Sequence, residues 1–369
     1  MLRVAVIGAG PAGLACAITL ERLGIRPDLF EKGEHVGYPV AMVQALLGIS
    51  HPRLGDPLSF LYREYGLAIQ PLAKLERVIY HCPDTREEIV AQHGYLLLRG
   101  RDEGSLERQL AGRLATKIHF CHWAEAWQLA GEYDYVVVAD GSGRTARGAG
   151  VWQRRVRAVV RGAKILGEFE PGTARMYLDT AYAGHGYGLL IPFDHRRAVL
   201  SLHLVRGPGD RMDHNWRLFL AREQLVYDVF TRFDLVFAAG TVERHQIGNV
   251  LLVGNAAGLT EPLLGLGLFA SMASGVQAAR AIAGQGDYEQ MLTPYVRRQE
   301  QFARARATFN TLDQAGISRL VKVLGLPLVR QLVPSGRLDV IGLGQPWLAG
   351  VEREEGRLRR TTTVEAGGE

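Results

Sequence analysis

Gly8, Gly10 and Gly13 have the spacing of a phosphate-binding turn near the start of the chain. Val4–Ile7 is a β-branched apolar run of buried-strand length, and residues 14–23 carry helical apolar spacing. Gly8 permits a tight turn, Gly10 lets the backbone approach a pyrophosphate, and Gly13 lets the helix lie close to the strand. The phosphates would meet the positive N-terminal end of that helix. This pattern predicts a dinucleotide-binding turn.

An acidic residue stands where such a unit binds a ribose. Residues 27–30 read as a second strand, which ends at Glu31. A carboxylate there suits two hydrogen bonds from a ribose diol and would repel a 2′-phosphate. The sequence therefore favours FAD or NAD over NADP at this position.

Two distant segments bear on the choice between FAD and NAD. Residues 135–147, YVVVADGSGRTAR, read as a buried strand ending in an Asp-Gly pair, and residues 249–283 read as a strand, a glycine-containing loop and a small-residue helix. With these segments the chain resembles the flavin-dependent group that includes the aromatic-ring hydroxylases and, more closely, the geranylgeranyl reductases. The closer resemblance depends on GPAG at 10–13, GNAAGLTEPLLGLGL at 254–268 and YGLLIPF at 187–193, and it covers roughly residues 1–290.

The resemblance implies a set of FAD-binding residues. Gly8, Gly10, Ala12 and Gly13 would hold the pyrophosphate, and Glu31 the adenosine ribose. Arg99 would lie near the phosphates and ribityl chain, although it could instead cap a strand at the surface. Asp140 and Gly141 would lie near the pyrophosphate, or form only a turn after a strand. The later loop contributes Gly254, Asn255, Pro262, Gly265, Gly267 and Leu268.

Two positions depart from the resembling family. Asn255 stands where the family has an aspartate that accepts a hydrogen bond from a ribityl hydroxyl. An amide keeps an acceptor oxygen but loses the charge, so we expect weaker FAD binding, and Asn255→Asp should tighten it by about 1 kcal/mol. Ala41 stands about where several members carry a cysteine close to the flavin, which puts chemistry that needs this thiol in doubt.

The helix predicted at residues 266–282 carries a further implication. In the resembling fold its N-terminus points at the flavin pyrimidine edge, where its dipole would stabilise negative charge on reduced flavin. Plain core packing explains the same helix equally well. The resemblance places Tyr187, His185 and Tyr38 near the flavin, each more easily explained as structural, and Tyr187 is the candidate proton donor. The sequence shows no metal-ligand pattern and no catalytic triad.

Composition and pattern indicate a two-part α/β chain. Its 369 residues are 47% hydrophobic and 22% charged, enough for a large core. We expect a Rossmann-like FAD-binding domain with an inserted antiparallel-sheet substrate domain and C-terminal helices. The predicted ranges are 1–70, 96–150 and 243–290 for the FAD-binding domain, 71–95 and 151–242 for the substrate domain, 291–350 for the helices and 351–369 for a disordered tail.

The sequence also favours a cytoplasmic protein. It has no apolar run of membrane-spanning length, its first residues read as a strand and not as a signal peptide, and its three cysteines show no CxxC spacing. The net charge of +5 is spread along the chain, which favours anionic ligands or lipid head groups and not nucleic acid. Residues 320–332 read as an apolar segment that could line an elongated substrate pocket, form a buried helix pair broken at Pro327, or contact a membrane surface. The oligomeric state stays open.

These observations predict an FAD-dependent oxidoreductase. The favoured function is a reductase that takes electrons from NAD(P)H or a reduced carrier and passes hydride to a carbon–carbon double bond of a small hydrophobic, isoprenoid-type substrate. An NAD(P)H-dependent aromatic hydroxylase is the first alternative. A flavin-binding relative without catalytic activity is the second, because of Asn255 and Ala41.

Overall fold

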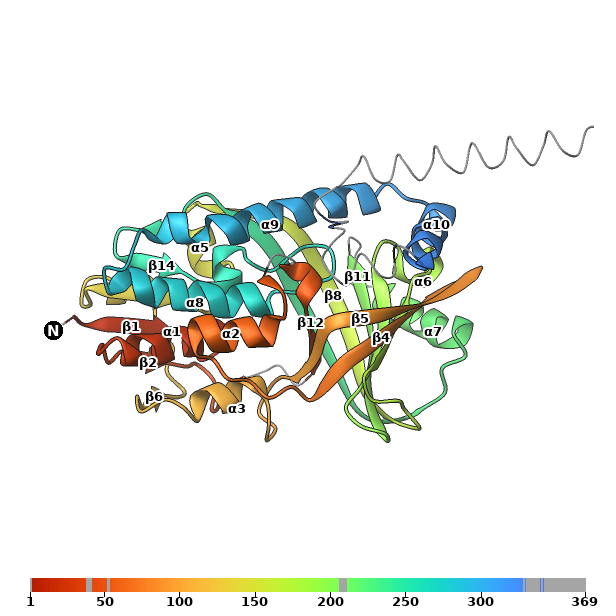
Figure 1. Ribbon diagram of the computed structural model, residues 1–369, viewed down its shortest axis with the longest axis horizontal. Coiled ribbons are helices and arrows are strands. Elements are labelled where there is room, and N and C mark those ends of the chain that lie inside the picture. The colour runs from red at the N-terminus through yellow and green to blue at the C-terminus, as the bar shows by residue number, and fades with distance from the viewer. Residues whose placement is uncertain are drawn as a thin grey trace, which may run out of the picture.

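The chain forms two β-sheets with helices packed around them (Figure 1). The structure is a computed structural model, and it describes residues 2–37, 42–51, 54–205 and 211–327, together with residues 329, 339 and 341. Tyr38, Ala41 and the predicted tail at 351–369 lie outside the described residues, as does most of the segment from 328 to 350. No helix within the described ranges is both long enough and apolar enough to cross a bilayer.

The smaller sheet is built around the strand that precedes the glycine turn. It consists of β1 (Val4–Ile7), β2 (Asp28–Phe30), β6 (Ile118–His119), β7 (Tyr135–Val138), β13 (Gln246–Ile247) and β14 (Val250–Leu252). The strand order is β13-β14-β7-β1-β2-β6, and all neighbours run parallel except β13 and β14. β1, β7 and β14 are almost entirely buried, as expected of parallel strands covered on both faces. The carboxyl ends of β7, β1 and β2 therefore share one edge.

Two helices with small residues pack closely beside this sheet. They are α1 (Pro11–Arg22) and α8 (Leu268–Ile282), and they contact each other along their lengths. A Cβ added at Gly275 would lie 2.1 Å from the carbonyl oxygen of Ala12, so only glycine allows this approach. Helix α9 (Tyr288–Phe309) runs along the outside of α8 (Figure 1). Shorter helical segments are α2 (Pro57–Tyr65), α3 (Leu106–Ala111), α4 (Ala126–Leu129), α5 (Arg144–Gly148) and the 3-10 turns η1 (Gly48–Ser50) and η4 (Gly254–Ala257).

The larger sheet has eight strands and is mostly antiparallel. Its strands are β3 (Val43–Leu47), β4 (Ala73–Cys82), β5 (Thr85–Leu98), β8 (Trp152–Leu166), β9 (Thr173–Tyr177), β10 (Tyr187–Pro192), β11 (Arg197–Val205) and β12 (Asp228–Val242). The order is β12-β8-β11-β10-β9-β4-β5-β3, and only β4 and β9 pair in parallel. Helices α6 (Thr180–Ala183) and α7 (Met212–Arg222) bury Tyr182 and Phe219 against it. Helix α10 (Gln314–Leu324) packs Ile317 and Val321 against Tyr187.

This architecture confirms the predicted α/β class with a parallel sheet, a large antiparallel sheet and C-terminal helices. Two strands cross the predicted ranges. β3 falls within 1–70 but pairs with β5 in the larger sheet, and β5 runs to Leu98, beyond residue 95. The sequence alone does not place β3 in the larger sheet, because the strand that it pairs with is about fifty residues away along the chain.

Candidate cofactor site

The three glycines of the turn differ in what surrounds them: Gly8 and Gly13 contact the protein closely, and Gly10 does not. Gly8 has φ +102°, and a Cβ there would lie 2.4 Å from the carbonyl oxygen of Ala139. A Cβ on Gly13 would lie 1.9 Å from the carbonyl oxygen of Gly8. A Cβ on Gly10, the N-cap of α1, would meet no protein atom within 4 Å. The packing therefore requires Gly8 and Gly13, whereas the space beside Gly10 is open to a bound group.

Glu31 is fixed at the end of β2 by the backbone around it. Its Oε2 accepts the N–H of Ala9 at 2.8 Å, and its Oε1 accepts the N–H of Gly33 at 2.8 Å. The side chain is buried, and an ionised carboxylate can accept further hydrogen bonds at both oxygens. This geometry ties the acidic residue directly to the glycine turn, as binding of one dinucleotide by both would require.

Asp140 forms a side-chain turn after β7. Its Oδ1 accepts the N–H of Ser142 at 2.8 Å, and its Oδ2 accepts the hydroxyl of Thr145 at 3.3 Å. Burial raises the pKa of Asp140, although these hydrogen bonds oppose the shift. The turn places Gly141 in the left-handed region, with φ +70°, and its carbonyl oxygen accepts from Asn255.

Asn255 joins that turn to the loop before α8. Its Nδ2 donates to the carbonyl oxygens of Gly141 at 2.8 Å and Ala238 at 3.2 Å. Because both partners can only accept, they fix the orientation of the amide. Its Oδ1 is buried and has no hydrogen-bond partner among the described residues. A buried acceptor without a partner is costly unless a ligand hydroxyl or water satisfies it.

Arg99 is held by protein groups and is mostly buried. Its Nε donates to Oε1 of the fully buried Glu107 at 2.7 Å, and its Nη1 donates to the side-chain oxygen of Gln44. Glu107 also accepts the N–H of Gly100 at 3.1 Å. Arg99 thus links β5, β3 and α3, which is a structural role. It is not the exposed strand cap that the sequence left open.

Glu261 is a buried carboxylate that none of the sequence motifs predicts as a site residue. It is 1% exposed, and its oxygens accept the N–H groups of Leu263 at 2.6 Å, Leu264 at 2.9 Å and Leu266 at 2.9 Å. Burial raises its pKa to about 7, against the opposing effect of these bonds and of Arg306. The available signal was a lone acid within the apolar stretch LTEPLLGLGL.

The loop that Glu261 organises leads into α8. Pro262 follows Glu261 directly, Gly265 has φ +76°, and α8 begins at Leu268 with Gly267 as its N-cap. A Cβ on Gly267 would lie 2.8 Å from the hydroxyl of Thr260. The carboxylate therefore holds a tight turn that presents the N-terminus of α8, and Gly254 and Asn255 lie at the start of the same loop.

The candidate proton donor Tyr187 contacts this loop. Its hydroxyl donates to the carbonyl oxygen of Leu264 at 2.6 Å, and its ring stacks on His203 with a centroid separation of 4.4 Å. Burial raises the pKa of Tyr187 and lowers that of His203 to about 4. His185, the second candidate, makes a 2.9 Å contact from Nε2 to the carbonyl oxygen of Leu312. In this structure both side chains bond to backbone, which is a structural role.

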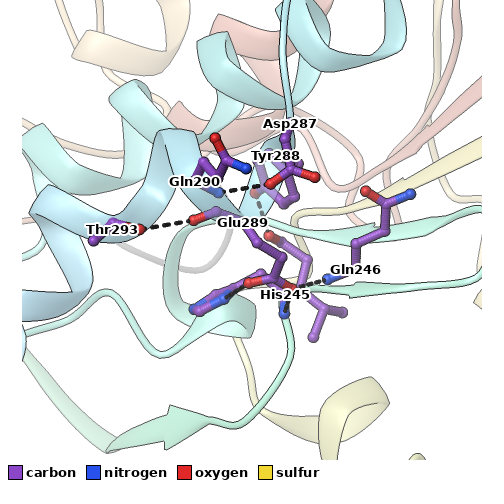
Figure 2. Close-up of polar contacts among 8 residues, drawn as sticks. His245, Gln246, Asp287, Tyr288, Glu289, Gln290 and Thr293 are labelled. Carbon is purple, nitrogen blue, oxygen red and sulfur yellow. Dashed lines mark hydrogen bonds and ion pairs between the residues drawn. The ribbon is translucent and has the colours of Figure 1, made fainter.

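A polar clamp anchors α9 to the strand that leads to Asn255 (Figure 2). Nδ1 of the buried His245 lies 2.7 Å from Oε2 of Glu289, and Glu289 Oε1 accepts the N–H of Gln246 at 2.9 Å. The hydroxyl of Tyr288 donates to the carbonyl oxygen of Leu252 at 2.5 Å. Burial would raise the pKa of Glu289, but the bonds from His245 and Gln246 lower it. These contacts fix β14 and hence the position of η4.

The chain is similar in sequence to known oxidoreductases. Residues 2–159 match the family model described as pyridine nucleotide-disulphide oxidoreductase. The chain is 24% identical over 326 residues to the digeranylgeranylglycerophospholipid reductase of Methanosarcina acetivorans, covering 78% of this chain and 75% of the relative.

Solved structures share the fold across both sheets. A geranylgeranyl bacteriochlorophyll reductase-like protein from Thermoplasma acidophilum superimposes with a TM-score of 0.70 at 16% identity, covering 92% of this chain and 97% of that one. The p-nitrophenol 4-monooxygenase of Pseudomonas putida gives a TM-score of 0.64 at 17% identity, covering 94% and 100%. A protein named as a flavoprotein and a flavin-dependent brominase have the same fold.

These similarities confirm the resemblance to geranylgeranyl reductase-like flavoproteins that the motifs indicated. Together they support an oxidoreductase of the flavoprotein type, with FAD as its cofactor.

Proposed function

We propose that the chain binds FAD along the track from Asn255 past the glycine turn to Glu31. The observation that carries this proposal is the buried Oδ1 of Asn255, which has no partner among the described residues and lies in the loop that continues to α8. The open space beside Gly10 and the carboxylate of Glu31 supply complementary positions for a pyrophosphate and a ribose. The residues present therefore fit the cofactor.

Each part of the site has a defined task in this proposal. The N–H groups at the start of α1 would bind the pyrophosphate, because they have no helical acceptor and carry the positive end of the helix dipole. Glu31 would accept from the ribose diol, and Asn255 Oδ1 from a ribityl hydroxyl. Leu268 and the first turn of α8 would lie at the pyrimidine edge, where the helix dipole stabilises negative charge. When bound, FAD supplies reversible two-electron, hydride-transferring chemistry.

We further propose that the reaction reduces a carbon–carbon double bond of a hydrophobic, isoprenoid-type substrate. The relative named as a reductase supports this function over most of the chain. The apolar cluster of Leu178, Tyr187, Ile317 and Val321, with Leu264 packed against it, joins the larger sheet to α10 beside the loop. An apolar substrate would be bound there by burial of its surface. The donor would be NAD(P)H or a reduced electron carrier.

The first test is the colour and cofactor content of the purified protein. A yellow protein that releases FAD on acid precipitation is expected. Titration with FAD should restore the flavin spectrum of protein from which the cofactor has been removed. A colourless protein that gains no flavin spectrum with excess FAD would contradict the proposal at its first step.

The second test distinguishes a reductase from a monooxygenase. The monooxygenase is the alternative because the chain shares its fold with a nitrophenol monooxygenase. Under anaerobic turnover with a chemically reduced dye, a reductase converts a long-chain prenyl alcohol into a product with two additional hydrogens. A monooxygenase needs oxygen and adds an oxygen atom to its substrate. Mass spectrometry of the product with and without oxygen distinguishes the two activities.

A further inference from the structure

A fixed, exposed tryptophan lies beside the end of the track proposed for FAD. Trp123 is 55% exposed, yet its indole N–H donates to Oε1 of Glu125 at 2.8 Å. The guanidinium carbon of Arg144 lies 4.7 Å from the ring centroid, and Nζ of Lys32 lies 5.9 Å from it. Arg144 also pairs with Glu125 at 3.4 Å. These contacts hold the ring in one orientation at the surface.

The strand order places this ring in line with the phosphate and ribose positions. The glycine turn follows β1, Glu31 follows β2, and β6 is the next strand along the sheet. Adjacent strands are about 4.8 Å apart, so β6 lies about 10 Å from β1. An adenosine extends beyond its ribose in the direction away from the pyrophosphate. Its base would therefore reach the segment that follows β6, which contains Trp123.

The backbone after β6 is hydrogen-bonded to the residues around Glu31. The N–H of His122 donates to the carbonyl oxygen of Glu31 at 2.9 Å, and the N–H of Cys121 donates to that of Gly33 at 2.9 Å. Cys121 has φ +54°, a strained conformation for a residue other than glycine, and the chain adopts it just before Trp123. These contacts hold the backbone that leads into Trp123 against the backbone of Glu31 and Gly33.

Arg144 brings a second element to the same ring. It begins α5, after the turn formed by Asp140, and so reaches Trp123 from the far side of β1. Trp123 and Arg144 together bridge the ends of strands that flank β1 and β2. Aromatic faces stack on nucleobases, and nearby cations offset phosphate charge. The cluster of Trp123, Arg144 and Lys32 therefore has the chemistry to bind the adenosine half of a dinucleotide.

We propose that Trp123 stacks on the adenine of the bound dinucleotide, with Arg144 and Lys32 as its charged flanks. The inference depends on the proposed binding of FAD for its ligand, and it assigns a binding role to residues outside the glycine, Asp-Gly and Asn255 motifs. It predicts that the adenosine half alone, in the form of ADP, binds at this position.

Full-length protein, freed of bound nucleotide under native conditions, provides the test. ADP and FMN are titrated separately while tryptophan fluorescence is followed, and FAD is titrated by absorbance. We expect ADP to quench Trp123, and the Trp123→Leu variant to lose this quenching and to bind ADP and FAD about ten-fold more weakly. FMN affinity should not change, because FMN lacks the adenosine.

Trp127 offers a matched control, since it is 45% exposed on the neighbouring α4. Trp127→Leu should retain both the quenching and wild-type affinities, and Trp123→Phe should retain most of the affinity because its ring still stacks. Circular dichroism verifies that each variant is folded. Unchanged ADP and FAD affinity in folded Trp123→Leu, or an equal loss in Trp127→Leu, would overturn the assignment.

The outcomes separate this inference from the proposed function. If the wild-type protein binds FAD and the Trp123→Leu variant binds it equally well, the proposed function stands and the stacking role is wrong. If ADP quenches Trp123 but the wild-type protein gains no flavin spectrum with FAD, the stacking role stands and the proposed binding of FAD is wrong. Protein that binds neither ligand contradicts both.

Discussion

Replacing Asn255 by aspartate reverses an expectation based on residue type alone. In the resembling family an aspartate occupies this position, so Asn255→Asp should restore a charged acceptor and tighten FAD binding. The structure shows that the Asn255 amide also donates, to the carbonyl oxygens of Gly141 at 2.8 Å and Ala238 at 3.2 Å. An ionised carboxylate would face two acceptors instead of donating to them.

The magnitudes decide which effect is larger. Losing two hydrogen bonds costs about 1–3 kcal/mol, and the repulsion between a carboxylate and two carbonyl oxygens adds to this cost. A charged acceptor for a ribityl hydroxyl stabilises bound FAD by about 1 kcal/mol, and it has no such effect on the FAD-free protein. We therefore expect Asn255→Asp to lower the free energy of unfolding of the FAD-free protein by about 2 kcal/mol. FAD affinity should fall or stay constant, and should not rise.

The cost should depend on pH in a defined direction. Burial and the two carbonyl oxygens favour the protonated acid, which raises the pKa of the introduced carboxyl in the folded state above its unfolded value of about 3.9. The loss of stability is therefore small near that unfolded value. It grows as pH rises toward the folded pKa, and is constant above it.

Urea unfolding of FAD-free protein between pH 4 and 8, with FAD titrations at the same pH values, measures both effects. Asn255→Ala is the control, because it removes the donors without adding a charge, and its cost should not vary with pH. If Asn255→Asp binds FAD more tightly and unfolds at the wild-type urea concentration, the two amide hydrogen bonds contribute nothing and this reasoning fails.

Three further variants test the site and its support. Gly10→Ala should leave the free energy of unfolding nearly unchanged and weaken FAD at least ten-fold, whereas Gly13→Ala should destabilise the FAD-free protein by several kcal/mol; equal effects in urea unfolding would refute the distinction. Because burial raises the pKa of Glu261 from 4.5 to about 7, wild-type stability should fall by up to about 3 kcal/mol as pH rises through that range. Glu261→Gln should lack that slope, and a slope that persists would assign it to another group. Glu289→Gln should cost about 1 kcal/mol at pH 7, and this difference should shrink in acid as the wild-type carboxylate is protonated; a pH-independent cost would show that the charge of Glu289 does not contribute.

The first βαβ unit was predictable because its information is local. The strand, turn, helix and acidic end lie within about thirty consecutive residues, and Gly8 and Gly13 are required by contacts inside the unit or with Ala139, which follows β7. Helix α8 was predictable for the same reason, since a run of small apolar residues specifies a closely packed helix. The starts and ends of these elements follow from short-range sterics.

The pairing of β3 and the role of Arg99 were not predictable in this way. β3 is a strand because β5 pairs with it, and Arg99 is mostly buried because Glu107, Gln44 and the surrounding backbone come together there. Sequence patterns carry the propensity of a segment but not the identity of its distant partners. The resemblance supplied a role for Arg99, whereas its actual contacts needed the fold.

Asn255 and Glu261 show why residue type alone gives an incomplete account of a polar site. An asparagine at an aspartate position can be a weakened acceptor or a gained donor, and the two cases predict opposite effects of Asn255→Asp. The partners that decide between them, Gly141 and Ala238, are 114 and 17 residues away along the chain. The hydrogen-bond partners of Glu261, in contrast, are within five residues of it along the chain. Their N–H groups point toward its carboxyl group only in the folded loop. The carboxyl group of Glu261 therefore supports the loop by accepting from backbone N–H groups, whereas the amide of Asn255 donates to backbone carbonyls.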